Sequence, residues 1–313
     1  MEGIDLPNSL LKIGDNAFSN CRSLKTITIP NYVTTLGNAV ASNCSSLESL
    51  TIPSSVTTIG SNLISGCSVI ASLTIPNTVT SLKHQNFSNC DNLKTFVYPT
   101  GLAAADTTSL TCSSATSLES YIIPSGVTSI SFNACQNLRS ITIPSTVTKL
   151  DSSAFYACFS LKSVTLPDSI TSISTNTFNQ CYSLQTVTLP AHITKLDGSM
   201  FTNCYLLKEV IIPDDVTEIG NSVFQSCYSL TTLTIPANVT KIGNSAFTYC
   251  YGMKEYHFLR TTPPTIGTTP FNAIKSNCII YVPRSANQTV LNAYKTATNW
   301  SAYASYMQEE PAS

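Results

Sequence analysis

The stretch LTTLTIPANVTKIGNSAFTYC, residues 230–250, decides the fold of this chain. Leu233 and Ile235 alternate with polar neighbours, which is the two-residue period of a strand with one buried face. Pro236 ends that strand, because proline has no N–H to donate to a sheet. Gly243 follows and is expected to turn the chain with φ > 0, a conformation that glycine adopts without strain. The first half of the stretch therefore predicts a strand and a corner.

The second half of the stretch closes one structural unit, and the unit repeats along the chain. Ala246, Phe247 and Cys250 share one face and fit one short helical turn. Prolines recur with gaps of 23 residues in all but two cases, at Pro7, Pro30, Pro53, Pro76, Pro99, Pro124, Pro144, Pro167, Pro190, Pro213 and Pro236. A unit of this kind cannot bury its apolar side alone, so the regular period predicts a solenoid of stacked copies.

The unit I-x-I-P-x-x-V-T-x-I-G-x-x-A-F-x-x-C-x-x-L resembles the BspA-like leucine-rich repeat family over residues 4–256. We therefore expect a leucine-rich-repeat solenoid of about 11 repeats, with parallel β-strands on one face and short helical turns and irregular segments on the other. The resemblance implies a secreted or cell-surface protein of a host-associated microbe, often linked to adhesion. It implies no ligand, because the repeat motif is structural.

The chain divides into two expected parts, a leucine-rich repeat solenoid over residues 1–256 and a C-terminal capping segment over residues 257–313. In the second part, Cys278–Pro283 is expected to form a last strand. Ala286–Trp300 has the spacing of an amphipathic helix, and its final residue, the only tryptophan, is expected to cover the apolar end. This tail also resembles the C-terminal segment of gut-bacterial members of the family. Earlier, the period slips at residues 101–109, which are expected to form a loop or a distorted turn.

Composition argues against several classes of partner. Charged residues make up only 11% of the chain and the net charge is −1, so neither nucleic acid nor an anionic membrane surface is an expected partner. No apolar run approaches the roughly 20 residues of a membrane helix, so no membrane insertion is expected. No signal peptide opens the chain, which starts inside a repeat, so we expect a mature or trimmed form.

Catalytic and metal chemistry find little support in the sequence. His84, His192 and His257 occupy different slots of the repeat and match no metal-ligand or triad spacing. No glycine-rich phosphate loop is present. We therefore expect no enzyme activity, no cofactor and no metal.

Two sets of residues are expected to form structural ladders. Stacked copies of the cysteine would lie ~4.8 Å apart with nearly parallel Cβ vectors, a geometry that suits buried thiols better than disulfides. The cysteine ladder of the regular region is Cys135, Cys158, Cys181, Cys204, Cys227 and Cys250. The aromatic ladder three residues earlier is Phe155, Phe178, Phe201, Phe224 and Phe247.

One aromatic row is the sharpest candidate for a binding site. The residue after the cysteine is aromatic in five consecutive repeats, at Phe159, Tyr182, Tyr205, Tyr228 and Tyr251. Earlier repeats carry Arg, Ser, Asp or Gln in this slot, so the row is confined to one half of one face. Such a row either stiffens adjacent turns by stacking or presents an amphipathic stripe to a protein or a glycan.

The outward face of the strands is a secondary candidate. Thr165 and Thr188 belong to a row of hydroxyls that points away from the core, and Lys208 belongs to a mixed charge row beside it. The β-propensity of threonine and a solvated, soluble rim are the favoured explanations of these rows, and a flat recognition surface for a protein is the alternative. The sequence thus favours a protein that binds a host matrix protein or a surface protein through a repeat-built surface. A glycan-binding module and a structural spacer are the alternatives.

Overall fold

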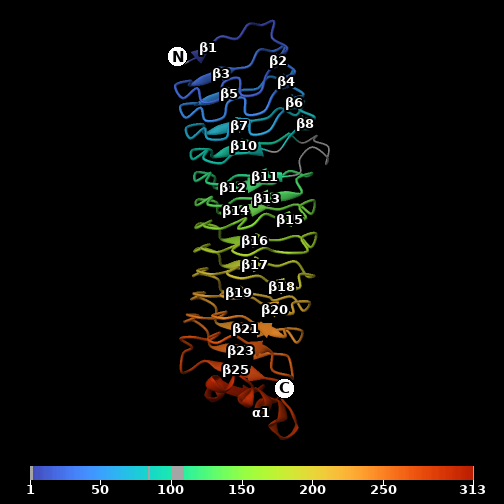
Figure 1. Ribbon diagram of the computed structural model, residues 1–313, viewed down its shortest axis with the longest axis vertical. Helices are drawn as coiled ribbons and strands as arrows, with labels where there is room; N and C mark the ends of the chain where they lie inside the picture. Colours follow the sequence, from blue (N-terminus) through green and yellow to red (C-terminus); the bar gives the residue numbers. More distant parts are fainter. Residues whose placement is uncertain (1–2, 84, 100–108, 313) are drawn as a thin grey trace. The chain divides into compact units, whose positions relative to one another are not determined.

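The computed structural model describes residues 3–83, 85–99 and 109–312, and the chain forms two compact units, residues 1–151 and 152–313. Each unit is a β-solenoid in which short parallel strands stack from one circuit of the chain to the next (Figure 1). We call one circuit a rung. The expected leucine-rich-repeat solenoid of parallel strands is confirmed, but the described residues of the two units together form about 13 rungs instead of the expected 11 repeats. Of the expected loop at 101–109, residues 101–108 lie outside the described residues.

Unit 1 contains two sets of strands. The first set precedes the repeat prolines and comprises β1 (Gly3–Ile4), β3 (Thr26–Thr28), β5 (Ser49–Thr51), β7 (Ser72–Thr74), β10 (Thr95–Val97), β12 (Ser120–Ile122) and β14 (Ser140–Thr142). The second set comprises β2 (Lys12–Ile13), β4 (Thr35–Leu36), β6 (Thr58–Ile59), β8 (Ser81–Leu82), β9 (Gln85–Asn86), β11 (Ser109–Thr111), β13 (Ser129–Ser131) and β15 (Lys149–Leu150). The strands pair in parallel, with equivalent residues of successive rungs opposite one another, as in Thr26 opposite Ser49.

Unit 2 repeats this plan and adds a helical end. Its first set of strands is β16 (Ser163–Thr165), β17 (Thr186–Thr188), β19 (Glu209–Val210), β21 (Thr232–Ile235), β23 (Glu255–Phe258), β25 (Ile279–Val282) and β26 (Met307–Glu309). The second set is β18 (Lys195–Leu196), β20 (Glu218–Ile219), β22 (Lys241–Ile242) and β24 (Thr265–Ile266). The helical segments are η1 (Ala286–Gln288), α1 (Thr289–Thr296) and η2 (Ser301–Tyr306). None of these helical segments, within the described residues, has the length and apolarity needed to cross a membrane.

The strands form because single apolar residues alternate with hydroxyl residues. In β3 the side chain of Ile27 is buried between the exposed Thr26 and Thr28, and the same pattern recurs in most strands of the first sets. The second sets come from the V-T-x-I part of the repeat, where only the second residue of a two-residue strand is buried. These second strands were not predicted, since two residues are too short for a sequence periodicity to reveal.

The expected helical turn after each glycine is replaced by a different structure. Within the segment, isolated hydrogen bonds join residues three apart, as from Cys204 N–H to the Phe201 carbonyl at 3.1 Å, but these turns do not continue into a helix. Its other amides instead donate to the next rung, as from Phe201 N–H to the Val223 carbonyl at 2.8 Å. Left-handed residues such as Ser199 (φ 57°) and Asn203 (φ 62°) interrupt the segment, and their amides donate to the Asn221 and Gln225 carbonyls of the next rung at 2.8 and 2.9 Å. Each rung thus satisfies the backbone of its neighbour.

Gly243 has a steric role and does not have the positive φ that its sequence context suggested. A Cβ added to Gly243 would lie 2.5 Å from the backbone nitrogen of Asn221 in the preceding rung, far inside van der Waals contact. The amide of Asn244 in turn donates to Oδ1 of Asn221 at 2.8 Å. The glycine is therefore required because two rungs approach closely at this corner.

At the C-terminal end of unit 2, the only tryptophan of the chain packs into the core. Trp300 is fully buried, donates from Nε1 to the Pro264 carbonyl at 2.8 Å, and meets Phe258 edge to face at a centroid distance of 5.1 Å. Figure 1 shows α1 beyond β25 at this end. β23, β24 and β25 continue the two sets of strands past residue 256. The division into a solenoid over 1–256 and a cap over 257–313 remains a proposal.

Candidate binding surface

Five aromatic rings of unit 2 stack in one row along the solenoid, one from each rung. We call this row the aromatic stripe; it consists of Phe159, Tyr182, Tyr205, Tyr228 and Tyr251. Successive ring centroids lie 4.8, 5.0, 4.9 and 5.5 Å apart. The interplanar angles are 8°, 1°, 4° and 25°. The structure therefore brings together all five residues that the sequence placed in one row.

The backbone before each ring fixes the direction of the side chain. The residue preceding the cysteine is left-handed in each rung of the stripe: Ala157 (φ 56°), Gln180 (65°), Asn203 (62°), Ser226 (62°) and Tyr249 (61°). The amide of the stripe residue two positions later donates back to the carbonyl of this left-handed residue, as from Tyr182 N–H to the Gln180 carbonyl at 2.9 Å. The intervening cysteine points into the core, so the ring points outward and meets its equivalent one strand spacing away.

Stacking decides which part of each ring meets solvent. Tyr182, Tyr205 and Tyr228 have a neighbouring ring on both faces, so these rings present mainly their edges and hydroxyl groups outward. Tyr228 and Tyr251 are 41% and 43% exposed, and the other three rings are half-buried. Burial, followed by the neighbouring phenols, raises the pKa of Tyr205, so its hydroxyl stays protonated at neutral pH. The stripe is therefore an uncharged row of hydroxyl groups and ring edges.

Two further exposed apolar residues, Leu206 and Tyr249, lie next to or near stripe residues in the sequence. Leu206 follows Tyr205 directly and is 45% exposed. Tyr249 is 38% exposed, and its ring centroid lies 5.8 Å from that of Tyr251. The sequence analysis did not single out either residue, although both stand in slots that hold small or polar residues in other rungs of unit 2.

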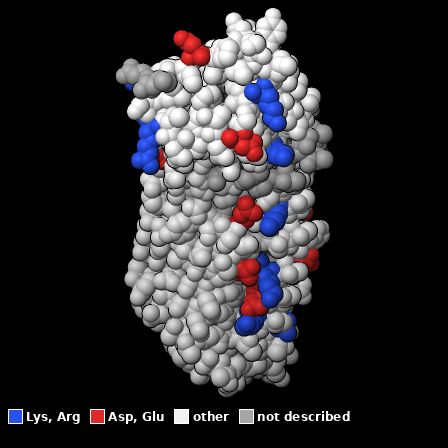
Figure 2. Space-filling model, turned by 45° about the horizontal axis from the view of Figure 1, so that its top comes forward, with Lys and Arg blue, Asp and Glu red and all other residues white. Residues whose placement is uncertain are grey.

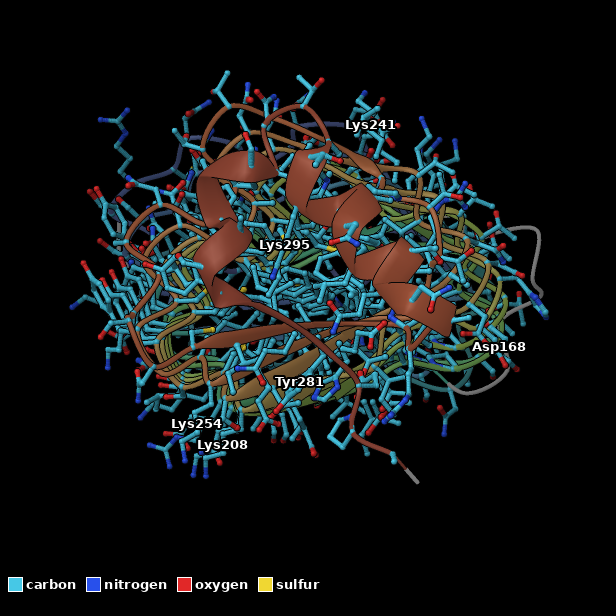
Figure 3. The ribbon with its side chains drawn as sticks, turned by 90° about the horizontal axis from the view of Figure 1, so that it is seen from below. Asp168, Lys208, Lys241, Lys254, Tyr281 and Lys295 are labelled. Carbon is cyan, nitrogen blue, oxygen red and sulfur yellow. The ribbon has the colours of Figure 1, made fainter. Side chains whose placement is uncertain are left out.

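The secondary candidates lie on the strand face next to the stripe. Thr165 and Thr188 are opposite one another in the β16–β17 register, and both side chains are exposed. Lys208 is exposed just before β19. In Figure 3, Lys208 and Lys254 project outward on one side of the sheet, Asp168 lies on the other side, and Tyr281 lies between them. On the strand face of unit 2, Lys162, Lys208 and Lys254 form a basic edge where strands begin, interrupted by Glu209 and Glu255. Asp168, Asp214 and Asp215 form an acidic edge where β16 and β19 end, and Arg260 follows β23 on that side.

Charges elsewhere on unit 2 form ion pairs between rungs. Glu218 of β20 lies between Lys195 and Lys241, with N–O distances of 3.3 and 2.7 Å, and these two cations hold its pKa below the usual value. At the acidic edge, Nδ1 of His192 lies 3.0 Å from Oδ2 of Asp215, and this hydrogen bond raises the pKa of His192. Figure 2 shows that the charged side chains in view are few and leave broad uncharged areas.

The two predicted ladders are buried; all their residues belong to unit 2 except Cys135, which belongs to unit 1. Phe155, Phe178, Phe201, Phe224 and Phe247 are buried, with successive centroids 5.4, 5.5, 5.5 and 5.8 Å apart. Cys135, Cys158, Cys181, Cys204, Cys227 and Cys250 are buried and form no disulfide. The sequence missed a polar role for the thiols, which donate hydrogen bonds to carbonyls of the preceding rung, as from Cys204 Sγ to the Phe178 carbonyl at 3.2 Å. It also missed Phe271, which extends the Phe ladder at 5.2 Å from Phe247.

Metal-ligating side chains do not gather into a site in the described part of the chain. No group of three or more His, Cys, Asp or Glu residues has metal-binding geometry there. The nearest approach is His257, whose Nδ1 lies 2.7 Å from Glu310 and whose Nε2 lies 3.4 Å from Glu255. Its ring stacks on Tyr281 at 5.0 Å. This cluster connects β23 to the segment after β26, which is a structural role.

Comparison with known proteins agrees with this architecture. The sequence profile of the BspA type leucine-rich repeat region matches residues 1–113, 108–231 and 217–303. A leucine-rich repeat protein from Bacteroides ovatus is similar in structure, with 24% identity, a TM-score of 0.71, and coverage of 99% of this chain and 84% of that chain. One from Eubacterium ventriosum has 21% identity, a TM-score of 0.53 and coverage of 88% and 84%.

A leucine-rich cell surface protein from Faecalibacterium prausnitzii matches with 27% identity, a TM-score of 0.46, and coverage of 82% of this chain and 88% of that chain. No curated protein matches the sequence. The two structures with the higher scores are under 25% identical to this chain, so they bear on the fold alone.

Proposed function

Because the chain belongs to the BspA-type leucine-rich-repeat family, whose profile spans nearly its whole length, we propose that it is a recognition protein that binds a partner protein at a microbial surface. The aromatic stripe carries this proposal, since it places five aligned rings on one side of unit 2. The partner class is a host extracellular-matrix or surface protein. The proposed role is adhesion, without catalysis.

The physical properties of the stripe suit a protein interface. Its length is roughly 20 Å, or four strand spacings, and a standard protein interface buries about 800 Å² on each partner. Tyrosine offers a large contact area at a small entropic cost, and stacking has already restricted these rings before any partner arrives. Tyr228 and Tyr251 are exposed, and a tyrosine hydroxyl can both donate and accept hydrogen bonds at the rim of such a contact.

The stacking geometry favours a protein over a glycan as the partner. A sugar ring packs best against an open aromatic face, because its C–H groups then meet the negative face of the π-system. Both faces of Tyr182, Tyr205 and Tyr228 are covered by neighbouring rings. Ring edges and hydroxyl groups remain, and backbone and side-chain groups of a protein match these well. A glycan partner and a purely structural spacer are outcomes of the test below.

The test is a triple substitution in the middle of the stripe, Tyr182→Ser, Tyr205→Ser and Tyr228→Ser. Serine stands in this slot at Ser45 and Ser68, so the rung tolerates it. We expect binding to solubilised extracellular-matrix proteins, measured by surface plasmon resonance, to weaken by more than about 30-fold, or about 2 kcal/mol. Circular dichroism checks that the fold is kept. The matched control changes the same three tyrosines to phenylalanine, which keeps the stack and removes only the hydroxyl groups.

Each competing function gives a different result. Full binding by the triple serine variant would place the contact elsewhere, with Thr165, Thr188 and Lys208 as the next candidates. A glycan-binding module would give signals on a carbohydrate array that free sugar abolishes. A spacer would bind neither matrix proteins nor glycans. If the serine variant unfolds, the phenylalanine variant still decides whether the hydroxyl groups contribute to binding.

A further inference from the structure

An open groove crosses the acidic edge of the strand face in unit 2, apart from the aromatic stripe. It has a volume of about 510 Å³ and is lined by two consecutive rungs, over residues 187–192 and 211–215. Ile211 stands on its wall and is 85% exposed, the highest exposure of any large apolar residue in the described part of the chain. The equivalent slots of the two preceding rungs hold Thr165 and Thr188. An isoleucine in this slot exposes more apolar surface to water than a threonine would.

Two local features create the groove. Ala191 is the first residue after the strand-ending proline, and the rungs before and after it have Asp168 and Asp214 in this slot. The short alanine side chain leaves space that a longer one would fill. In addition, the β17–β19 register stops after Val187 opposite Val210, whereas β16–β17 extends one pair further. Ile211 therefore lies just beyond the end of the shortened β19.

The charges around the groove are acidic. Asp214 and Asp215 line it, and both are exposed. Asp168 lies on the same edge and accepts a hydrogen bond from the Ala191 amide at 2.9 Å. His192 pairs with Asp215 and balances one of these carboxylates when its ring is protonated. The basic side chains Lys208 and Lys254 project from the opposite side of the sheet (Figure 3).

We propose that this groove binds an extended segment of a protein in which an apolar side chain stands next to a lysine or arginine. The apolar side chain packs on Ile211, and the cation meets Asp214 and Asp215. An extended segment fits better than a helix, because a helix with its side chains is about 10 Å wide and the groove spans only two rungs about 4.8 Å apart. The inference rests on the proposed function only in taking a protein as the partner, since it uses a different surface.

Selection from a library of random short peptides displayed on phage tests the groove with the intact protein as bait. We expect the enriched peptides to carry an apolar residue beside Lys or Arg. Synthetic copies should bind at least about tenfold more weakly to Ile211→Thr, and also to the double variant Asp214→Asn and Asp215→Asn. Ile122→Thr is the matched control, because Ile122 occupies the same slot in unit 1 and is 75% exposed. It should bind the peptides like the unchanged protein.

Several results would overturn the proposal. These are the absence of enrichment, enriched peptides without a basic residue, and equal binding by the Ile211→Thr variant. A concentration-dependent dimer in sedimentation velocity that Ile211→Thr abolishes would make the groove a contact between copies of this chain instead. The triple tyrosine-to-serine variant should keep full affinity for the peptides. Failure of the aromatic stripe as a site and failure of this groove are therefore separate outcomes.

Discussion

Replacing Phe201 with alanine tests whether the stacked Phe ladder stabilises unit 2. Phe201 is fully buried, and its ring centroid lies 5.5 Å from those of Phe178 and Phe224, at interplanar angles of 1° and 13°. The substitution removes the ring and leaves a cavity between two rigid neighbours. A buried Phe→Ala change costs about 3–5 kcal/mol, of which each lost ring pair contributes about 0.5–1.5 kcal/mol. We expect the free energy of unfolding to fall by that amount.

Urea and thermal unfolding measure this loss. Trp300 is the only tryptophan of the chain and lies buried at the C-terminal end of unit 2, so its fluorescence follows the unfolding of that unit. A loss of 3–5 kcal/mol should lower the melting temperature by about 6–20 °C in a unit of this size. Because each rung contacts only its neighbours, the loss should be transmitted along the unit through rung-to-rung coupling.

Ile211→Thr is the control for this experiment, since Ile211 lies in the same rung but exposes its side chain. It should change the free energy of unfolding by less than about 0.5 kcal/mol. Phe201→Leu should cost less than Phe201→Ala, because leucine fills most of the space. A loss below about 1.5 kcal/mol for Phe201→Ala, or one equal to that of Ile211→Thr, would refute the idea that the ladder is a tightly packed core.

Three further predictions concern the labelling of the thiols, their effect on stability at high pH, and the capping segment. A thiol reagent should label the exposed Cys21 in the native protein and label Cys181, Cys204 and Cys227 only after denaturation, so rapid native labelling of those three would contradict their burial. Burial raises the pKa of the Cys181, Cys204 and Cys227 thiols above the value in the unfolded chain. The free energy of unfolding should therefore be highest below about pH 8.5 and fall as the pH rises further, by up to about 1.4 kcal/mol per pH unit for each thiol. Urea titrations should show a smaller slope with pH for Cys204→Ala than for the unchanged protein. Trp300→Ala should lower the free energy of unfolding by about 3–5 kcal/mol and promote aggregation, which light scattering measures. The control Tyr294→Phe removes only the hydrogen bond from the hydroxyl group to the Arg260 carbonyl and should cost about 0.5–1.5 kcal/mol. Equal effects of the two changes would show that Trp300 does not seal the end.

The solenoid could be predicted because its period depends on one-dimensional constraints. Ile27 and Ile235 are both buried because each occupies the inward-facing slot of its strand. The prolines that follow these strands recur in the sequence at a nearly constant spacing. The stripe residues Tyr182 and Tyr205 were also predictable as neighbours, because equal slots of a solenoid must lie one rung apart. Periodicity therefore fixes which residues meet without any knowledge of the fold beyond the repeat.

Features that depend on backbone detail were not predictable in this way. The segment around Phe201 reads as a helical turn, since apolar residues three apart share a helical face, yet left-handed residues such as Asn203 direct its amides to the next rung. Gly243 avoids a clash with Asn221 that only the stacked neighbour creates. The groove at Ile211 depends on the β17–β19 pairing, which is one residue pair shorter than the β16–β17 pairing, and no residue type in the sequence indicates that change.

One rung of unit 2 presents four kinds of side chain in order across the solenoid. Tyr205 belongs to the stripe, Lys208 to the basic edge, Ile211 to the groove wall, and Asp214 to the acidic edge. A partner that lies across this rung would therefore meet an aromatic, a cationic, an apolar and an anionic contact within one strand and its flanks. If one partner protein covers both the stripe and the groove, the tyrosine-to-serine changes and Ile211→Thr must each weaken that same complex. If the losses in binding free energy from the two sets of changes are additive, the two sites act through separate contacts, as expected for positions without shared neighbours.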